Sequence, residues 1–463
     1  MTTIAIEVND AGITVAAPDR VLAVEPGYAL VEKDGIVTGA AAYAQARLRP
    51  RNVSNRYWAE LSLESGTGGI PGIRNSAELA FAQLARIWEQ FKSAASDVVL
   101  VVPGNYDKTR LGLLLGLTQE CGMPVRAMVD VAAAASTRPY PGRQLLYVNA
   151  GLHRFVVTPL RQENNEATAL EEKTLAKTGI AELNDLFAKR IRDMFVLATR
   201  FDPFHRADSE QALYDRLPQW LEQLRDAASI EALLPVDGEE FRVTVERSRL
   251  LGVAVGPYKA LVQLIAQARE PRAALAVQVS DRLARQPGLA AELARLDDTV
   301  VIVHEVGHAA RAVLAAVDKL PAGGQVKLLR RLAWREAPAE AVTPASTVAS
   351  PVPAPERETV KTTRPTHVVY RGIAYRINGE GLLIGRAHVD DRQVLVIDDQ
   401  SSGVSRSHCE IALADGELVV RDLSSYGTFV NEKRISGQEI LRPADVIRIG
   451  SPGAELQLVR VET

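Results

Sequence analysis

Three short motifs near the carboxyl end of the chain carry side chains suited to binding a phosphate group. They are Gly385-Arg386, the Ser-Arg-Ser-His segment 405–408 and the Ser-Ser-Tyr-Gly-Thr-Phe-Val-Asn segment 424–431. Guanidinium and hydroxyl groups form charge-assisted hydrogen bonds with a phosphate dianion. Each motif alone is common, but together they predict a phosphate site. Four side chains would supply its donors: Arg386, Ser405, Arg406 and Ser425.

The elements that must position these side chains are short strands. From His367 onward the chain consists of brief alternating runs separated by turn residues, which is typical of an all-β sandwich. The loops of a sandwich gather at its ends, so residues far apart in sequence can meet there. We therefore predict a β-sandwich domain over residues 367–463, with the phosphate site at one end.

Residues 383–459 resemble a forkhead-associated domain, which reads phosphothreonine peptides, in the order and spacing of the three motifs. The resemblance implies that Arg386 and Ser405 bind the phosphate, and that Arg406 and Ser425 help from flanking loops. It also implies a partner protein phosphorylated on threonine by a Ser/Thr kinase. Five residues would support the site by bracing loops or shaping turns: Gly385, His408, Gly427, Thr428 and Asn431.

One position departs from the family pattern. Tyr426 stands where an Asn usually grips the peptide backbone, and a Tyr hydroxyl cannot pair with both ends of an amide. Tyr426 is therefore assigned to the peptide site, with its effect on sequence preference left open. The alternative is a sandwich that has lost peptide binding and serves only in packing.

A segment rich in Pro, Ala and Thr, residues 337–366, precedes this domain and has no aromatic residue and no regular period. Such a composition buries too little to fold and predicts a semi-extended linker. The linker also offers a ligand within reach of the sandwich, so a phosphorylated linker threonine bound in cis, or by a second copy, is a further hypothesis. The candidates are Thr343, Thr347, Thr359, Thr362, Thr363 and Thr366.

The preceding residues, 1–336, alternate apolar strands with amphipathic helices, which predicts an α/β fold. Residues 98–102 form an apolar run that Pro103-Gly104 closes. A helix is expected next over residues 107–121, with Gly122 as its left-handed stop.

This part is similar to the nucleotide-binding domain of the seventy-kilodalton heat-shock chaperones. The similarity is greatest over residues 98–135 and extends to residues 24–50, 179–180 and 241–250. It implies the two-lobed actin-like ATPase fold, with ATP or ADP and Mg²⁺ as the ligands of the cleft.

The phosphate-binding loops of that fold are degenerate here. They need tight glycine turns and acids that hold Mg²⁺ and water. In segment 7–12, Glu stands in place of the expected Asp, and Asn-Asp in place of Gly-Thr. In segment 149–153, Asn stands in place of the acid, and Leu-His in place of the Gly pair. Segment 304–307 keeps a single Gly where the fold has a Gly-Gly turn. No lysine occurs between Lys33 and Lys92, where the catalytic lysine is expected. We predict a pseudo-ATPase whose remaining pocket, if any, includes Asn9, Gly12, Asn149, Gly151 and Gly307.

The segment His304-Glu305-Val306-Gly307-His308 matches the H-E-x-x-H zinc motif. On one helix the two histidines would face the same side, with Glu305 as general base. However, residues 300–303 are expected to form a strand, which leaves His304 at a turn. A zinc metalloprotease is therefore the minor alternative, since a degenerate turn explains the same residues.

The composition limits the remaining classes. The 463 residues carry 54 Lys and Arg against 57 Asp and Glu, a formal charge of −3, which disfavours nucleic acid as a partner. The first residues do not form a signal-peptide pattern, and no run reaches the roughly 18 apolar residues of a membrane span. We expect a cytoplasmic, bacterial interaction or scaffold protein that needs no cofactor and is not an enzyme. The alternative is an ATP-gated switch coupled to phosphopeptide binding.

Overall fold

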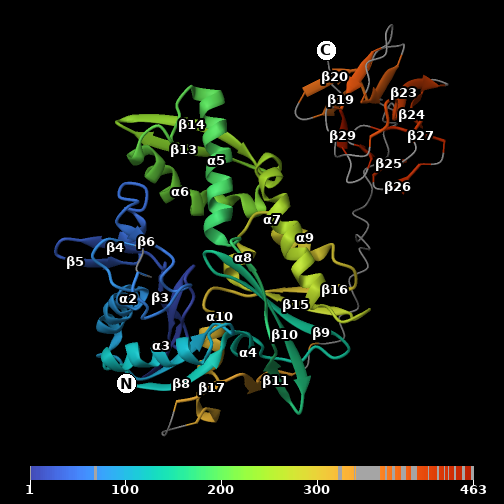
Figure 1. Ribbon diagram of the computed structural model, residues 1–463. Coiled ribbons are helices and arrows are strands. Elements are labelled where there is room, and N and C mark those ends of the chain that lie inside the picture. Colours follow the sequence, from blue (N-terminus) through green and yellow to red (C-terminus); the bar gives the residue numbers. More distant parts are fainter. Residues whose placement is uncertain are drawn as a thin grey trace, which may run out of the picture. The chain divides into compact units, whose positions relative to one another are not determined.

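The structure is a computed structural model in which the chain divides into two compact units, Met1–Ser346 and Thr347–Thr463 (Figure 1). The boundary falls inside the predicted linker, of which only residues 337, 339, 365 and 366 are described. The structure describes residues 2–66, 70–321, 326–337, 339, 365–370, 373–377, 381–386, 393–397, 404–414, 417–424, 427–431, 433–435, 437–442, 445–450 and 454–459.

The first sheet of unit 1 has the strand order β17-β8-β7-β1-β2-β3. Strands β1, β2 and β3 are antiparallel, whereas β7 and β8 run parallel to β1. The bounds are β1 (Thr2–Glu7), β2 (Ile13–Ala16), β3 (Val21–Glu25), β7 (Ala95–Val102), β8 (Val125–Asp130) and β17 (Leu328–Leu329).

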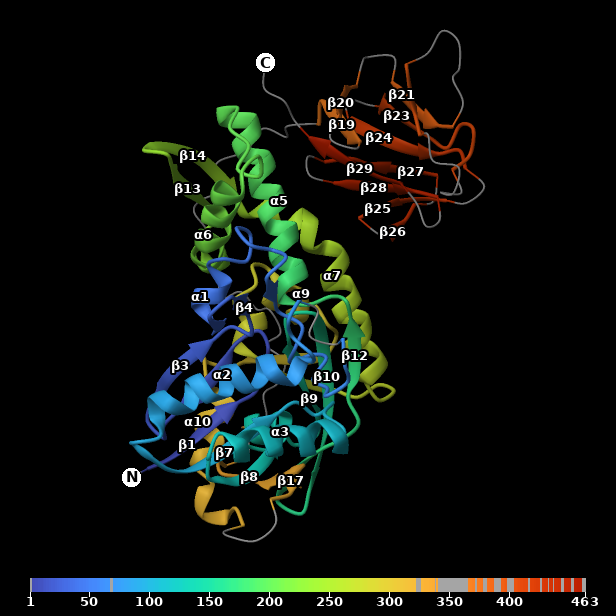
Figure 2. The same cartoon turned by 60° about the vertical axis from the view of Figure 1, so that its left-hand side comes forward.

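Alternation along β1 assigns each face of this sheet to a different core. Ile4 and Ile6 pack with α2 (Ser76–Phe91) and α3 (Lys108–Glu120), while Ala5 packs on the opposite side with α4 (Val131–Ala135) and α10 (His308–Leu314). Figure 2 shows α2 and α3 lying across one face of the sheet. The predicted helix over 107–121 is confirmed as α3, with the Asp107 carboxylate capping its first turn and Gly122 at φ 67°.

The second sheet of unit 1 repeats the topology of the first. Its order is β16-β15-β9-β10-β11-β18, with β12 beside β10, so β11-β10-β9-β15-β16 matches β3-β2-β1-β7-β8 in order and in strand direction. The sequence contains no short repeat that would predict the repeated strand order. The bounds are β9 (Gln144–Ala150), β10 (Arg154–Glu163), β11 (Glu166–Ala169), β12 (Lys173–Ala176), β15 (Leu275–Val279), β16 (Thr299–Val303) and β18 (Arg331–Ala333).

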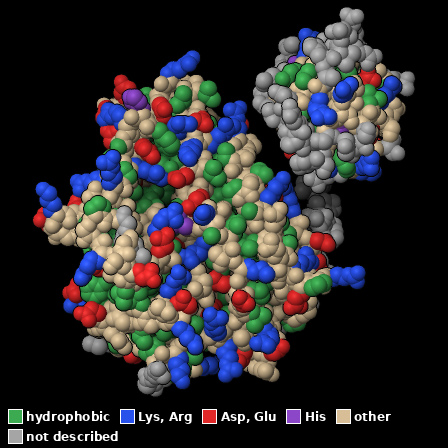
Figure 3. Space-filling model, in the orientation of Figure 1, with side chains coloured by type: hydrophobic (Ala, Val, Ile, Leu, Met, Phe, Trp, Pro, Cys, Tyr) green, Lys and Arg blue, Asp and Glu red, His purple; other side chains and the backbone are tan. Residues whose placement is uncertain are grey.

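One long helix packs on β10 and β12 of this second sheet, and two further long helices and a hairpin extend the same apolar core beyond it. Helix α7 (Arg247–Ala268) is the one described helix whose length and composition would let it cross a membrane, but its apolar side packs in the same core as α5 and the sheet. Figure 3 shows acidic and basic side chains interspersed over the visible face of unit 1. The other elements are α5 (Ile180–Thr199), α6 (Ala207–Asp226), α8 (Asp281–Ala284), α9 (Leu289–Ala294), β13 (Ser229–Val236) and β14 (Glu239–Glu246), with η1 (Val317–Lys319) and, near the first sheet, β4 (Ala29–Glu32), β5 (Gly35–Thr38), α1 (Ala40–Tyr43) and β6 (Val53–Ser54).

Unit 2 consists of two antiparallel-rich sheets around one apolar core, which confirms the predicted C-terminal β-sandwich. Their orders are β20-β19-β29-β28-β25-β26 and β22-β21-β23-β24-β27. The chain as a whole is therefore of mixed α/β class with a terminal sandwich. The bounds are β19 (His367–Tyr370), β20 (Ile373–Arg376), β21 (Leu382–Gly385), β22 (Val394–Val396), β23 (Cys409–Ala414), β24 (Glu417–Asp422), β25 (Thr428–Val430), β26 (Lys433–Arg434), β27 (Gln438–Ile440), β28 (Val446–Ile449) and β29 (Ala454–Val459).

Candidate functional site

The loops after β21 and before β23 meet at the predicted phosphate residues. The backbone N–H of Arg386 donates to the carbonyl oxygen of Ser405 at 3.1 Å. Gly385 packs so closely on the next loop that a β-carbon there would collide with the carbonyl oxygen of Arg406. The side chains of Arg386 and Arg406 are exposed and Ser405 is half-buried. Two guanidinium groups and a hydroxyl-bearing residue therefore share one end of the sandwich.

His408 links this pair of loops to a third one. Its buried ring accepts the Ser405 N–H at Nδ1 (3.0 Å), and its Nε2 lies 3.2 Å from the carbonyl oxygen of Gly427. Because Nδ1 accepts, Nε2 must carry the proton and donate it to Gly427. Burial lowers the pKa of His408, which keeps the ring in this neutral form. The ring is thus placed so as to brace the Ser405 loop.

The third loop is tied down by Asp422, a residue that the motif comparison missed. Its Oδ1 accepts hydrogen bonds from the Ser424 N–H, the Ser424 hydroxyl (2.7 Å) and the buried Thr428 hydroxyl (2.9 Å). The Ser424 hydroxyl in turn accepts the Gly427 N–H at 2.7 Å. Burial raises the pKa of Asp422, but these hydrogen bonds outweigh it and hold the pKa below its ordinary value. The sequence signal that could have identified Asp422 is its position two residues before Ser424, a spacing at which an Asp side chain can hydrogen-bond to the following turn.

Three predicted residues of the sandwich lie elsewhere or outside the described part. Ser425 and Tyr426 are not among the described residues. Asn431 follows β25 at the end opposite Gly427, where it adopts φ 48°. There it donates to the Asp445 carboxylate (2.8 Å) and accepts the Val446 N–H (3.0 Å). The expectation that Asn431 supports the phosphate loops is therefore wrong, because it fixes the turn between β25 and β26 instead.

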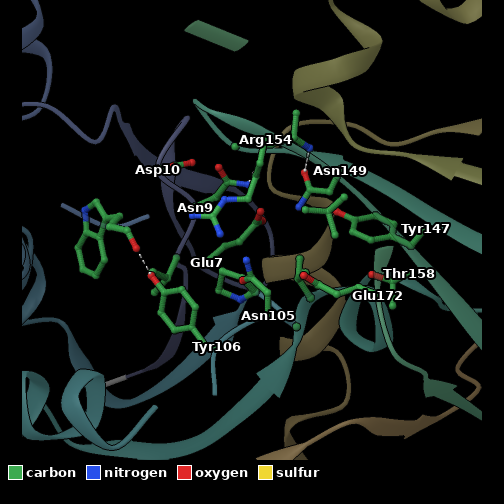
Figure 4. Close-up of a pocket in the computed structure, with 18 residues that line it drawn as sticks. Glu7, Asn9, Asp10, Asn105, Tyr106, Tyr147, Asn149, Arg154, Thr158 and Glu172 are labelled. Atoms are coloured by element: carbon green, nitrogen blue, oxygen red, sulfur yellow. Dashed lines mark hydrogen bonds between the residues drawn. The ribbon is translucent and has the colours of Figure 1, made fainter. Parts of the chain in front are cut away.

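Unit 1 contains a pocket of about 40 Å³ where loops from both sheets meet (Figure 4). The loops after β1, β7 and β9 each contribute, so the structure brings Asn9, Asn149 and Gly151 together as predicted. A space of this size holds a few water molecules, whereas pockets for organic ligands enclose roughly 300–1,000 Å³. Its polar lining includes Glu7, Asn9, Asp10, Asn105, Tyr147, Asn149, Arg154, Thr158 and Glu172.

The loops of the two sheets hydrogen-bond to each other across this pocket. Asn9 donates through Nδ2 to the Ala150 carbonyl at 3.1 Å, and the Leu152 N–H donates to Asp10 Oδ1 at 2.8 Å. A β-carbon at Gly151 would collide with the same carboxylate oxygen. The groups that a phosphate would need are therefore already engaged with the opposite loop.

A buried ion pair between Arg282 and Glu7 lies beside the pocket. Arg282, the second residue of α8, lies 2.7 Å from Glu7 and also donates to the Gly12 carbonyl at 2.6 Å and the Thr14 hydroxyl at 3.2 Å. Burial opposes the charge of Arg282, but the carboxylates of Glu7 and Asp281 outweigh it and raise its pKa. Gly12 does not line the pocket, because Arg282 covers it. Its assignment to a nucleotide pocket is wrong.

The charges that remain in the pocket do not suit Mg²⁺. Figure 4 shows the Arg154 side chain extending into the pocket beside Asn9. Within the described part of the chain its guanidinium makes no hydrogen bond or ion pair. Burial raises the pKa of Glu172 to about 7, and the charge of Asp130 adds to the effect. The Arg154 guanidinium repels a divalent cation, and an acid whose pKa is raised is a weaker metal ligand, so the residues present do not fit Mg²⁺.

The H-E-x-x-H segment is not a metal site in this fold. Strand β16 ends before His304 and α10 begins at His308, with Gly307 at φ 70° packed on Val21. Gly307 therefore lies away from the pocket, and its assignment to a nucleotide site is wrong.

Two side chains of this segment, His308 and Glu305, contact protein groups and are not arranged around a metal ion. His308 Nε2 lies 2.9 Å from the Ala135 carbonyl, and Glu305 is 84% exposed and pairs with Arg311. Burial and the neighbouring His308 lower the pKa of His304 to about 3. Across the described ranges, no three His, Cys, Asp or Glu side chains are grouped to hold a metal ion.

Comparison with known families identifies the domain family of the sandwich. Residues 382–450 match the FHA domain family, so unit 2 contains an FHA domain. This match covers β21 to β28, which carry all three phosphate motifs. It does not extend to unit 1, and no curated protein matches the chain.

Proposed function

We propose that this protein is a phosphorylation-dependent interaction or scaffold protein, and that its FHA domain binds a threonine-phosphorylated partner through Arg386 and Ser405. The observation that carries the proposal is the backbone hydrogen bond that joins the loops of these two residues, at an end of the sandwich where the Arg386 and Arg406 side chains are exposed. A dianionic phosphate between two guanidinium groups gains charge-assisted hydrogen bonds of about 1.5–3 kcal/mol each. The proposed setting is the cytoplasm, with a Ser/Thr kinase supplying the modification.

Binding to a phosphothreonine peptide library, measured by fluorescence anisotropy, tests this. The full chain should retain a subset of phosphorylated peptides and none of their unphosphorylated forms. Arg386→Gln should weaken binding at least about tenfold, because two charge-assisted bonds are lost. The control is Arg421→Gln on β24, whose side chain pairs with Gln438. Equal binding by Arg386→Gln and Arg421→Gln would refute the assignment.

The structure reduces the number of linker threonines that could bind to the phosphate site. Thr366 is hydrogen-bonded into the sandwich, since its N–H donates to Val459 and its carbonyl accepts from Ile377. It is therefore unsuited to reach the phosphate loops. The other five linker threonines lie outside the described residues. Alanine at all five should abolish any phosphorylation-dependent self-association, and self-association that persists would exclude the linker as ligand.

For unit 1 we propose the two-lobed actin-like fold of the heat-shock chaperones, without ATP hydrolysis. The repeated strand order of the two sheets supports the fold, and the small, internally bonded pocket supports the loss of activity. Isothermal titration with ATP and Mg²⁺ should give no saturable heat. Saturable, Mg²⁺-dependent binding would instead favour the ATP-gated switch.

A further inference from the structure

One basic side chain of the sandwich lies directly against the phosphate loops without belonging to any of the three motifs. A β-carbon at Gly427 would lie 2.6 Å from Nε of Arg434 and 3.1 Å from its Cζ. Gly427 has φ 92°, so its backbone conformation favours glycine, and the absence of a β-carbon leaves room for the Arg434 side chain. The Arg434 guanidinium therefore lies directly beside Gly427, at the start of β25.

Arg434 begins a row of side chains on the outer face of its sheet. Phe429 is the register partner of Arg434 on β26 and of Arg448 on β28. Residues directly opposite each other in antiparallel strands point to the same face. Thr428 and Val430 are buried, so Phe429 and both arginines occupy the opposite, outer face. We call Arg434, Phe429 and Arg448 the arginine row.

The row carries positive charge that the described part of the sandwich does not neutralise. Arg448 lies over the Phe429 ring, with 4.0 Å from Cζ to the ring centroid, and this cation–π contact fixes its direction. Neither Arg434 nor Arg448 forms an ion pair with a described residue. The nearest acid by register is Glu455, the partner of Arg448 at the far end of the row from Arg434.

A short chain of contacts connects Arg434 to the predicted phosphate residues. Gly427, against which Arg434 lies, accepts from His408, and the same ring holds the Ser405 N–H. Each link is a direct contact, so an extended peptide, which advances about 3.3 Å per residue, crosses them within a few residues. A peptide held at Ser405 by its phosphate can therefore reach Arg434 with a neighbouring side chain.

We propose that Arg434 is a specificity-determining residue of the FHA domain and selects an acidic side chain close to the phosphothreonine. This inference rests on the proposed function. A carboxylate pairs with the planar guanidinium through two parallel hydrogen bonds, and Arg448 adds to the local potential. Phe429 keeps Arg448 extended along the sheet and so shapes the row.

A phosphothreonine library, with four randomised positions on each side, tests the proposal on the full chain. The wild type should enrich Asp and Glu about three- to tenfold at one or two positions, and Arg434→Gln should remove that enrichment. Arg434→Gln should still bind an acid-free phosphopeptide within about twofold of wild type. Arg434→Lys should keep part of the enrichment, and Arg421→Gln all of it.

The possible results distinguish the role of Arg434 from phosphothreonine binding itself. Enrichment that survives Arg434→Gln, or its absence from the wild type, overturns the role of Arg434 while leaving phosphothreonine binding intact. If the wild type binds no phosphothreonine peptide, the proposed function fails and this inference fails with it. Thermal unfolding of each variant shows whether the sandwich is intact, and Arg434→Lys gives the answer if Arg434→Gln does not fold.

Discussion

At the scale of single residues, several positions are fixed by what surrounds them rather than by their own chemistry. Gly385 allows the Arg406 carbonyl to approach, and His408 can connect two loops only as a neutral ring. Both residues are buried and so cannot contact a ligand through a side chain. Their contribution is to hold Arg386 and Ser405 in place, so their loss should affect stability and binding together.

Gly385→Ala tests this coupling. The added methyl group would displace the Arg406 carbonyl, so we expect a loss of about 2–3 kcal/mol in the unfolding free energy of unit 2 and a clear loss of phosphopeptide affinity. Gly437→Asn is the control, because it has φ 84°, which Asn tolerates, and nothing lies within 4 Å. Denaturant unfolding and peptide titration measure both effects. A normal affinity in Gly385→Ala would contradict the close packing described.

His304 should make the stability of unit 1 depend on pH. Because burial lowers its pKa to about 3 in the folded state, the unfolded chain binds the proton more tightly. The contribution of a neutral His304 is complete above pH about 6.5 and falls as the pH drops toward 3, by about 1.4 kcal/mol per pH unit. His304→Phe, which can still stack on Tyr147, should flatten this slope in thermal unfolding scans. Identical slopes for both proteins would contradict the assignment.

At the scale of elements, α8 is connected to the β1–β2 turn by a single buried cation. Arg282→Met would leave Glu7 buried and unpaired, which costs about 3–5 kcal/mol. Adding Glu7→Gln should recover part of that loss, since the orphaned charge disappears. The matched control is Arg285→Met on the same helix, whose side chain is 45% exposed and should cost under about 1 kcal/mol. Equal losses for both arginines, by denaturant unfolding, would refute this account.

How much of this the sequence predicts depends on the range of the interaction. Local signals placed α3 between Asp107 and Gly122, and turn chemistry placed the loop motifs of the sandwich. Arg282 could not be found this way, because its partner Glu7 is 275 positions away and no local pattern marks Arg282. The zinc motif, by contrast, is a local pattern that the fold does not use as a metal site. Five consecutive residues matched a pattern, while a strand end and a helix start divided them.

At the scale of the whole molecule, the chain combines a unit whose pocket is internally bonded with a unit that exposes Arg386 and Arg406 at one end of its sandwich. Nucleotide should therefore leave unit 1 unaffected, whereas phosphopeptide should stabilise unit 2 by mass action. In calorimetric scans, ATP with Mg²⁺ should not shift either transition, and a saturating phosphopeptide should raise the transition that Gly385→Ala lowers. A rise in the unit 1 transition with ATP would restore the switch as the better description.

The repeated strand order of unit 1 has an evolutionary consequence. Such symmetry is the expected trace of an ancestral gene that was duplicated and fused, after which each copy contributed one turn to the shared pocket. Asp10 comes from the first copy and Gly151 from the second, and each now occupies space that the other must leave free. In orthologues the two positions should covary: a larger residue at 151 should accompany a smaller one at 10.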